Sequence, residues 1–246
     1  MTGKTADSSG PSKIPTQWRT VSPVPIGFMR QFSYMDRLFA LIADVPGDIV
    51  ECGVGEAGSF AMLAFFAGQE GRRPVRTLWG FDSFEGWPVP SPLDASPRNP
   101  EKGQWKVDRE MVDRRLKESK IKEEFPDLPV RIVPGFLSKS LTNDSPFQRG
   151  GGRQIAFLHL DVDLHDSYRD ALENLFHAVS VGGVIAFDEY REFPRDGIIQ
   201  AGHTWDGKTE KWPGCTIAID DFFHFRPERL RHDPNTDKWW TVKVAD

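Results

Sequence analysis

The stretch Asp48-Ile-Val-Glu-Cys-Gly-Val-Gly-Glu-Ala-Gly58 decides the fold of this chain. From Asp48 to Val54 it is a short, mostly apolar run containing glycine, which predicts a buried strand that enters a tight turn. Residues 59–67, after the turn, are apolar nearly all round, as in a helix packed between a sheet and its neighbours. A strand, a glycine turn and a buried helix in this order indicate an α/β unit.

The rest of the chain repeats this alternation of strands and helices. Apolar runs predict four more strands, at residues 77–81, 130–134, 155–160 and 184–187. Helical spacing predicts further helices at 28–43, 107–124 and 168–179, the last with Asp166 as its N-cap and Gly182-Gly183 as its stop. We therefore expect an α/β fold with a doubly wound, mostly parallel, Rossmann-like sheet. Residues 240–244 alternate and predict an antiparallel C-terminal strand at or near the sheet edge.

Length and composition limit the classes of function. The 246 residues suit one α/β domain, which we place at 21–246 behind a flexible tail at 1–20. A net charge of −5 and the lack of a basic stripe argue against nucleic acid as a partner. No apolar run approaches the roughly 20 residues that span a bilayer, so we expect no membrane segment. Two cysteines cannot form a disulfide framework, and a reduced, cytoplasmic location fits best.

The glycine turn predicts a cofactor site. Ligands of such sheets bind beyond the carboxyl ends of the strands, where the pattern Gly53-x-Gly55-x-x-Gly58 lies. Asp82, directly after the second strand, is placed to hold both hydroxyls of a ribose. These features are shared by nicotinamide and S-adenosylmethionine sites, and a turn that binds nothing is a further alternative.

Two glutamates in the turn favour S-adenosylmethionine. Glu56 places negative charge where a pyrophosphate would meet the helix N-terminus, which argues against a dinucleotide. Glu51 suits a cofactor that has a cationic amino-acid end. We therefore rank a methyltransferase first and a nicotinamide oxidoreductase second.

Acidic residues that follow two strands predict a metal site. Asp161 follows the strand at 155–160, and Asp188 and Glu189 follow the strand at 184–187. Neighbouring strands lie about 5 Å apart, so these carboxylates should converge, and their repulsion would be relieved by a divalent cation. Ligation by oxygen alone favours magnesium, calcium or manganese over zinc. The alternative is that these side chains only cap nearby loops and helices.

Asp163 is the first candidate for a general base. It lies two residues beyond Asp161, and in an extended chain its side chain would point to the same side, near a metal without ligating it. His165 is the alternative base, whereas Asp166 is expected to be a helix cap. His159, inside a strand, is expected to be a core histidine or to support the metal ligands.

Four segments together resemble the macrocin O-methyltransferase family. They are Glu51-Cys-Gly-Val54, Phe81-Asp-Ser-Phe-Glu-Gly86, His159-Leu-Asp-Val-Asp-Leu164 and Gly182-Gly-Val-Ile-Ala-Phe-Asp-Glu-Tyr190, in the family's order. The resemblance extends from about Gly47 to Phe223. It implies the class I methyltransferase form of the sheet and S-adenosylmethionine as cofactor. It further implies transfer of a methyl group to a sugar hydroxyl of an antibiotic.

The resemblance also implies roles for individual residues. Asp161, Asp188 and Glu189 correspond to magnesium ligands, and Asp163 to the base. The cofactor contacts would come from the turns after the first two strands, at Glu51, Gly53, Gly55, Asp82 and Ser83. The chain departs from the family in two places: Asp188-Glu189 replaces the usual Asp pair, and Gly55-Glu56-Ala57-Gly58 lacks the usual paired glycines.

The expected acceptor is a small molecule with a hydroxyl group, and two loops at 83–105 and 189–213 are expected to wall its pocket. Their candidate contacts are aromatic, arginine and histidine side chains that could also be packing residues: Trp87, Trp105, Tyr190, Arg191, Phe193, Arg195, His203, Trp205 and Trp212. Family members assemble, so the resemblance implies a homo-oligomer. A catalytically silent relative that acts as a binding partner is the third class of function considered.

Overall fold

The computed structural model describes residues 24–245 except 72–74, 143–144, 194–197, 200–202 and 205–207. The expected tail at 1–20 lies outside these residues. The helices are α1 (Ile26–Leu41), α2 (Gly58–Gln69), α3 (Arg109–Glu118), α4 (Ile121–Glu124), α5 (Leu137–Ser140), α6 (His165–Leu175) and α7 (Pro213–Phe223), with 3-10 turns η2 (Pro92–Asp94) and η3 (Phe176–Ala178).

The strands of the described residues form one large sheet and one two-stranded sheet. They are β1 (Asp48–Cys52), β2 (Leu78–Asp82), β3 (Val130–Pro134), β4 (Ile155–Leu160), β5 (Val179–Phe187), β6 (Ile198–Ile199), β7 (His203–Thr204), β8 (Arg231–Asp233) and β9 (Lys238–Val242). The large sheet has the order β3-β2-β1-β4-β5-β9-β8, and β6 pairs with β7. Pairing is parallel from β3 to β5, and β9 is antiparallel to both of its neighbours. The predicted doubly wound fold with an antiparallel C-terminal strand is confirmed.

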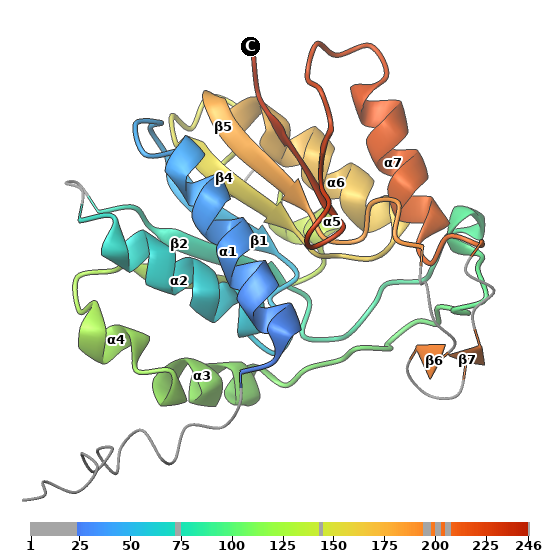
Figure 1. Ribbon diagram of the computed structural model, residues 1–246, viewed down its shortest axis with the longest axis horizontal. Coiled ribbons are helices and arrows are strands. Elements are labelled where there is room, and N and C mark those ends of the chain that lie inside the picture. Colours follow the sequence, from blue (N-terminus) through green and yellow to red (C-terminus); the bar gives the residue numbers. More distant parts are fainter. Residues whose placement is uncertain are drawn as a thin grey trace, which may run out of the picture.

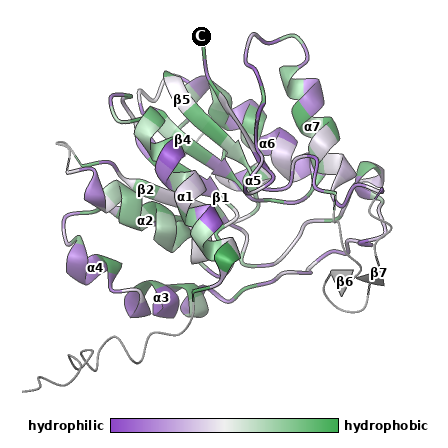
Figure 2. Ribbon diagram, in the orientation of Figure 1, coloured by the Kyte–Doolittle hydropathy of each residue, from purple (hydrophilic) through white to green (hydrophobic). Residues whose placement is uncertain are grey.

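Helices cover both faces of the sheet (Figure 1). On one face α1 and α2 pack over β1, β2 and β4, with Met35, Phe60 and Phe157 in the same core. On the other face α6 and α7 enclose a core that contains Tyr168, Phe187 and Cys215. The central strands β4 and β5 are largely hydrophobic, and α4 is hydrophilic (Figure 2). Among the described residues, no helix is long and apolar enough to cross a membrane.

Several predicted boundaries were wrong. The helix expected at 107–124 is divided into α3 and α4 at Lys120, whose φ is +58°. The helix expected at 168–179 is α6, which begins and ends earlier. Strand β5 starts at Val179, so Gly182-Gly183 lies inside the strand and does not end the helix. Pairing of Val179 with Ile155 on β4 favours the strand over more helix. Neither α7 nor β8 was predicted.

Asp166 does not cap α6. It lies inside the first turn, where its Oδ1 is 2.9 Å from His165 Nδ1 and forms an ion pair with Arg169 at 2.9 Å. The helix is capped from a distance instead, because the His165 amide donates to Oδ1 of the buried Asp94, at 2.7 Å. Asp94 thereby fixes the loop at 83–105 to the start of α6.

Candidate active site

A cavity of about 410 Å³ lies along the carboxyl ends of β1, β2, β3 and β4. This is the edge at which ligands bind in open α/β sheets, at the point where the strand order reverses between β1 and β4. We call it the donor cavity. Its wall comprises Gly53, Val54, Gly55, Glu56, Gly58, Ser59, Phe81, Asp82, Ser83, Gly86, Trp87, Pro88, Trp105, Val107, Gly135, Phe136, Leu137, Asp161, Val162, Asp163 and Ser167.

Two glycines of the turn have a left-handed backbone, and one of them has no room for a side chain. At Gly53 (φ +86°) a Cβ would lie 1.7 Å from the carbonyl oxygen of Asp161, so a side chain cannot fit. At Gly55 (φ +49°) a Cβ would meet open space, which leaves the backbone accessible from the cavity. The Gly55 amide donates to Asp82 Oδ2 at 2.9 Å. The turn after β1 is thus tied to the end of β2.

Asp82 and Ser83 both line the donor cavity, as expected for cofactor contacts. Asp82 Oδ1 accepts the Phe84 amide at 2.8 Å, and the Ser83 hydroxyl donates to the Gly86 carbonyl at 2.8 Å. These hydrogen bonds fix the start of the loop at 83–105. The carboxylate of Asp82 is therefore held in place at the cavity wall.

Glu51, the remaining expected cofactor residue, is not on the cavity wall. It pairs with His159 across β1 and β4, is fully buried, and its Oε1 lies 2.8 Å from His159 Nδ1. Burial raises the pKa of Glu51. Because the side chains of a strand alternate between faces, Glu51 points into the core although it lies at the correct end of β1.

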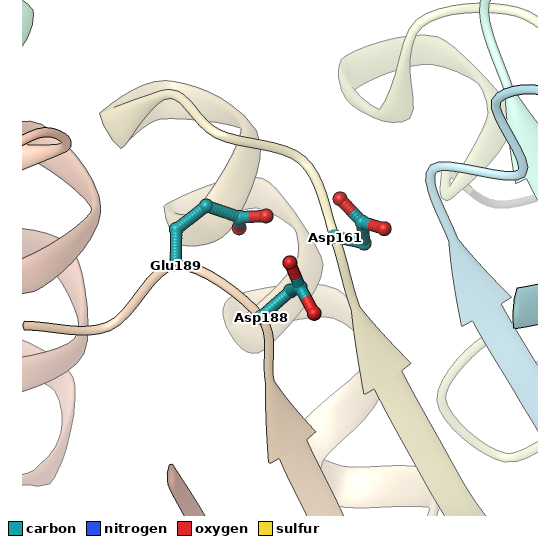
Figure 3. Close-up of side chains that lie close together, drawn as sticks. All are labelled: Asp161, Asp188 and Glu189. Atoms are coloured by element: carbon teal, nitrogen blue, oxygen red, sulfur yellow. The ribbon is translucent and has the colours of Figure 1, made fainter. Parts of the chain in front are cut away.

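Asp161, Asp188 and Glu189 converge as predicted (Figure 3). Asp161 follows β4 and Asp188 follows the adjacent β5, and the Asp188 amide donates to the Leu160 carbonyl at 2.9 Å. One carboxylate oxygen from each of the three residues lies within 4.8 Å of the other two. We call these residues the acidic cluster. A set of oxygen donors this close is suited to a hard divalent cation.

The electrostatics show how crowded the acidic cluster is without a cation. Burial and the charge of Asp188 raise the pKa of Asp161 to about 8. Burial and the neighbouring aspartates raise the pKa of Glu189 well above its usual value. Burial disfavours ionisation of Asp188, but the ammonium of Lys238, 2.7 Å from Asp188 Oδ2, together with His159 and a hydrogen bond with Glu189, outweighs burial and lowers the pKa of Asp188. A cation in the cluster would favour the ionised form of all three groups.

Asp163 reaches the same region by a different route from the expected one. The chain is not extended there, because Asp163 has a φ of +57°. Its Oδ2 accepts the indole proton of Trp87 at 2.8 Å, and burial raises its pKa to about 7. It lines the donor cavity and also a second cavity beside the acidic cluster. His165, the alternative base, lines neither, and its Nδ1 faces Asp166.

A second cavity of about 200 Å³ adjoins the first, and we call it the acceptor cavity. It is lined by Arg98, Trp105, Asp161, Asp163, Asp188, Glu189, Glu192, Lys211 and Trp212. Trp105, Asp161 and Asp163 belong to both cavities, so the two cavities adjoin at these three residues. Both expected loops contribute to the wall.

Among the candidate acceptor residues, several pack against other side chains, and Trp105 is exposed to the cavities. Trp87 and Trp212 are buried against each other, and Tyr190 is buried with its hydroxyl on Asp220. Trp105 is 52% exposed. Arg191 forms an ion pair with Asp220 at 3.5 Å. Phe193 is exposed but lines neither cavity, and the side chains of Arg195, His203 and Trp205 lie outside the described residues.

Sequence reasoning missed other parts of the site. Gly135, Phe136 and Leu137 line the donor cavity after β3, where only their position beyond a strand end could have indicated them. Arg98 and Lys211 line the acceptor cavity from loops that have no regular pattern.

This strand order, with a glycine turn at the reversal point and an acidic cluster beside it at the ends of β4 and β5, is that of a Rossmann-like methyltransferase sheet. A family model described as macrocin-O-methyltransferase (TylF) matches residues 27–206. The chain belongs to this family and is an O-methyltransferase. The family assignment favours methyl transfer over the nicotinamide oxidoreductase considered as the second class.

Individual relatives agree with this assignment. The chain is 31% identical over 213 residues, covering 80% of this chain and 73% of the relative, to the 8-demethyl-8-(2,3-dimethoxy-alpha-L-rhamnosyl)-tetracenomycin-C 4'-O-methyltransferase of Streptomyces olivaceus. It is 32% identical over 162 residues, covering 61% of this chain and 55% of the relative, to the demethyldecarbamoylnovobiocin O-methyltransferase of Streptomyces niveus. A solved calicheamicin methyltransferase shares the fold, with a TM-score of 0.72 at 23% identity, covering 94% of this chain and 90% of that one.

Proposed function

We propose that this chain transfers a methyl group from S-adenosylmethionine to a hydroxyl group of a sugar or glycosylated small molecule, with the help of a divalent cation. The observation that carries the proposal is the junction of the two cavities. Asp163 and Asp161 of the acidic cluster line both cavities, where a donor in one cavity would meet an acceptor in the other. The sugar is supported by the relative named for a rhamnosyl substrate.

The donor cavity suits S-adenosylmethionine in size and in its polar groups. Its volume falls in the usual range for small-molecule sites. Asp82 would accept hydrogen bonds from the ribose hydroxyls, and Gly55 would let the backbone approach the ligand closely. Because Glu51 is buried against His159, we propose that its role is to support the strand ends rather than to contact the donor.

Asp161, Asp188 and Glu189 would hold the cation, for which magnesium is our first choice. Their oxygens are close enough to converge on one ion, and carboxylates are ligands preferred by hard cations. A cation bound there would polarise the acceptor hydroxyl and make it more acidic.

Asp163 would act as the general base. As the acceptor oxygen bonds to the methyl carbon and the carbon–sulfur bond breaks, the carboxylate takes the hydroxyl proton, and S-adenosylhomocysteine leaves as a neutral thioether. The hydrogen bond from Trp87 to Oδ2 orients the carboxyl group and leaves Oδ1 for the acceptor. Asp163 is not one of the three residues of the acidic cluster.

Trp105 would provide the stacking surface for the acceptor ring. It has a left-handed backbone (φ +58°), a conformation that costs a residue other than glycine roughly 1 kcal/mol or more. The adjoining segment is held to Trp87 by backbone hydrogen bonds in both directions, Trp87 to Gln104 at 2.9 Å and Gly103 to Trp87 at 3.0 Å. A large indole that is kept exposed at both cavities is well placed to bind the apolar face of a sugar.

We also propose a reduced, cytoplasmic location, since Cys52 and Cys215 are both free and buried. A homo-oligomer remains an expectation from the resemblance alone.

The direct test is methyl transfer from radiolabelled S-adenosylmethionine to a panel of deoxysugar-bearing compounds in the presence of magnesium. Labelled product with a new O-methyl group, located by mass spectrometry, is the expected result. Binding of NAD more tightly than S-adenosylhomocysteine in calorimetry would contradict the proposal.

A further inference from the structure

Two side chains that line neither cavity contact the acidic cluster. Tyr168, on α6, is fully buried, and its hydroxyl group bonds with the Leu160 carbonyl at 2.9 Å and with Oε2 of Glu189. Lys238, the first residue of β9, bonds with the Asp188 carbonyl and with Asp188 Oδ2, both at 2.7 Å. Each of the two acidic residues that follow β5 therefore has its own partner.

These partners occupy one oxygen of each carboxylate. Glu189 Oε2 accepts from the Tyr168 hydroxyl, and the Asp163 amide lies 3.4 Å from the same atom. Asp188 Oδ2 is held by Lys238. The second oxygens, Glu189 Oε1 and Asp188 Oδ1, have neither of these partners. One oxygen of each carboxylate is therefore engaged by a partner, and the other faces no such partner.

This arrangement matters most for Glu189. A glutamate arm has one more rotatable bond than an aspartate, so an unrestrained carboxylate could turn and offer both oxygens. Magnesium binds in a compact octahedron at 2.0–2.1 Å and keeps several waters, whereas calcium takes 6–8 oxygens and often binds a carboxylate through both. Ligation by single oxygens therefore favours the smaller ion.

We propose that Tyr168 and Lys238 are positioning residues that restrict Glu189 and Asp188 to one ligating oxygen each and thereby make the acidic cluster select magnesium over calcium. The inference rests on the proposed function, in which the cluster holds a divalent cation. Partners of metal ligands commonly change metal affinity by about 10–100-fold when they are removed.

The test compares magnesium and calcium affinities by calorimetry on the full chain, using each chloride salt alone. In Tyr168→Phe we expect the magnesium affinity to fall about tenfold or more and the calcium affinity to fall much less, so that the affinity ratio shifts toward calcium. Tyr190→Phe is the matched control, since it removes a phenol hydroxyl that bonds with Asp220 and not with the acidic cluster. The ratio of magnesium affinity to calcium affinity in this control should equal that of the unchanged protein.

Lys238→Met supplies an independent variant if Tyr168→Phe does not fold. Removing the positive charge changes both affinities alike, because the two ions carry the same charge, and this effect cancels in the ratio. A shift of the affinity ratio toward calcium would then show that the freed oxygen of Asp188 takes part in binding the cation. An unchanged ratio in the variants that fold, or an equal loss of both affinities, would overturn the proposal and leave only a packing role. If the unchanged protein binds neither ion, the cation of the proposed function fails, and this inference fails with it.

Discussion

Replacement of Asp163 by asparagine isolates the proton-transfer step. The amide has nearly the size of the carboxylate, and its oxygen can still accept a hydrogen bond from Trp87, whose Nε1 lies 2.8 Å from Asp163 Oδ2. Asp163 is not one of the three residues of the acidic cluster, so cation binding should be retained. The variant loses only the group that takes the proton. We expect the single-turnover rate to fall roughly 10²–10⁴-fold, which corresponds to about 2.7–5.4 kcal/mol of barrier at 1.36 kcal/mol per tenfold.

The assay is a rapid-quench single turnover with labelled S-adenosylmethionine and an acceptor from the panel. Calorimetry with S-adenosylhomocysteine and with magnesium checks that both sites remain intact. Asp166→Asn is the matched control, because this carboxylate lies three residues further on, lines neither cavity, and should be dispensable. Full activity of Asp163→Asn together with loss of activity in His165→Gln would refute the assignment of the base.

Three further substitutions test other parts of the site. Asp82→Ala should weaken S-adenosylhomocysteine binding more than tenfold, or roughly 1.4 kcal/mol, because it removes the ribose acceptor and the partner of the Gly55 amide; unchanged calorimetric affinity would argue against this role. Trp105→Ala should raise the KM for the acceptor about tenfold with little change in stability, since the side chain is half exposed. An unchanged KM would show that Trp105 is not the stacking surface for the acceptor. Asp94→Ala should cost about 1–2 kcal/mol of stability through the lost cap of α6, seen as a lower Tm that the exposed control Asp44→Ala does not show.

Much of the sheet could be predicted because strand periodicity and chain order carry the information. The runs at 130–134 and 155–160 are the strands β3 and β4, and parallel pairing brings the ends of β4 and β5 to one edge. For that reason Asp161 and Asp188 could be placed together without coordinates. The same rule located Asp82 beside the glycine turn.

The remaining features depend on contacts between distant residues. Asp94 caps α6 across 71 positions, and Lys238 reaches Asp188 across 50, so no local pattern indicates either pair. The charge of Glu51 and the family resemblance predict a cofactor contact, but strand alternation and the partner His159 place Glu51 in the core. The left-handed backbone at Asp163 is a turn that the residue type does not reveal.

The measurement that tests the central claim most directly is methyl transfer after removal of divalent cations. The protein is dialysed against EDTA, assayed with labelled S-adenosylmethionine and a confirmed acceptor, and assayed again after magnesium is returned. Asp161→Asn and Asp188→Asn provide the comparison, because amides are poorer ligands for hard cations. We expect chelation to abolish turnover, magnesium to restore it in the unchanged protein, and both variants to stay inactive at the same magnesium concentration. Full activity in EDTA would contradict this expectation and would leave the acidic cluster without a cation.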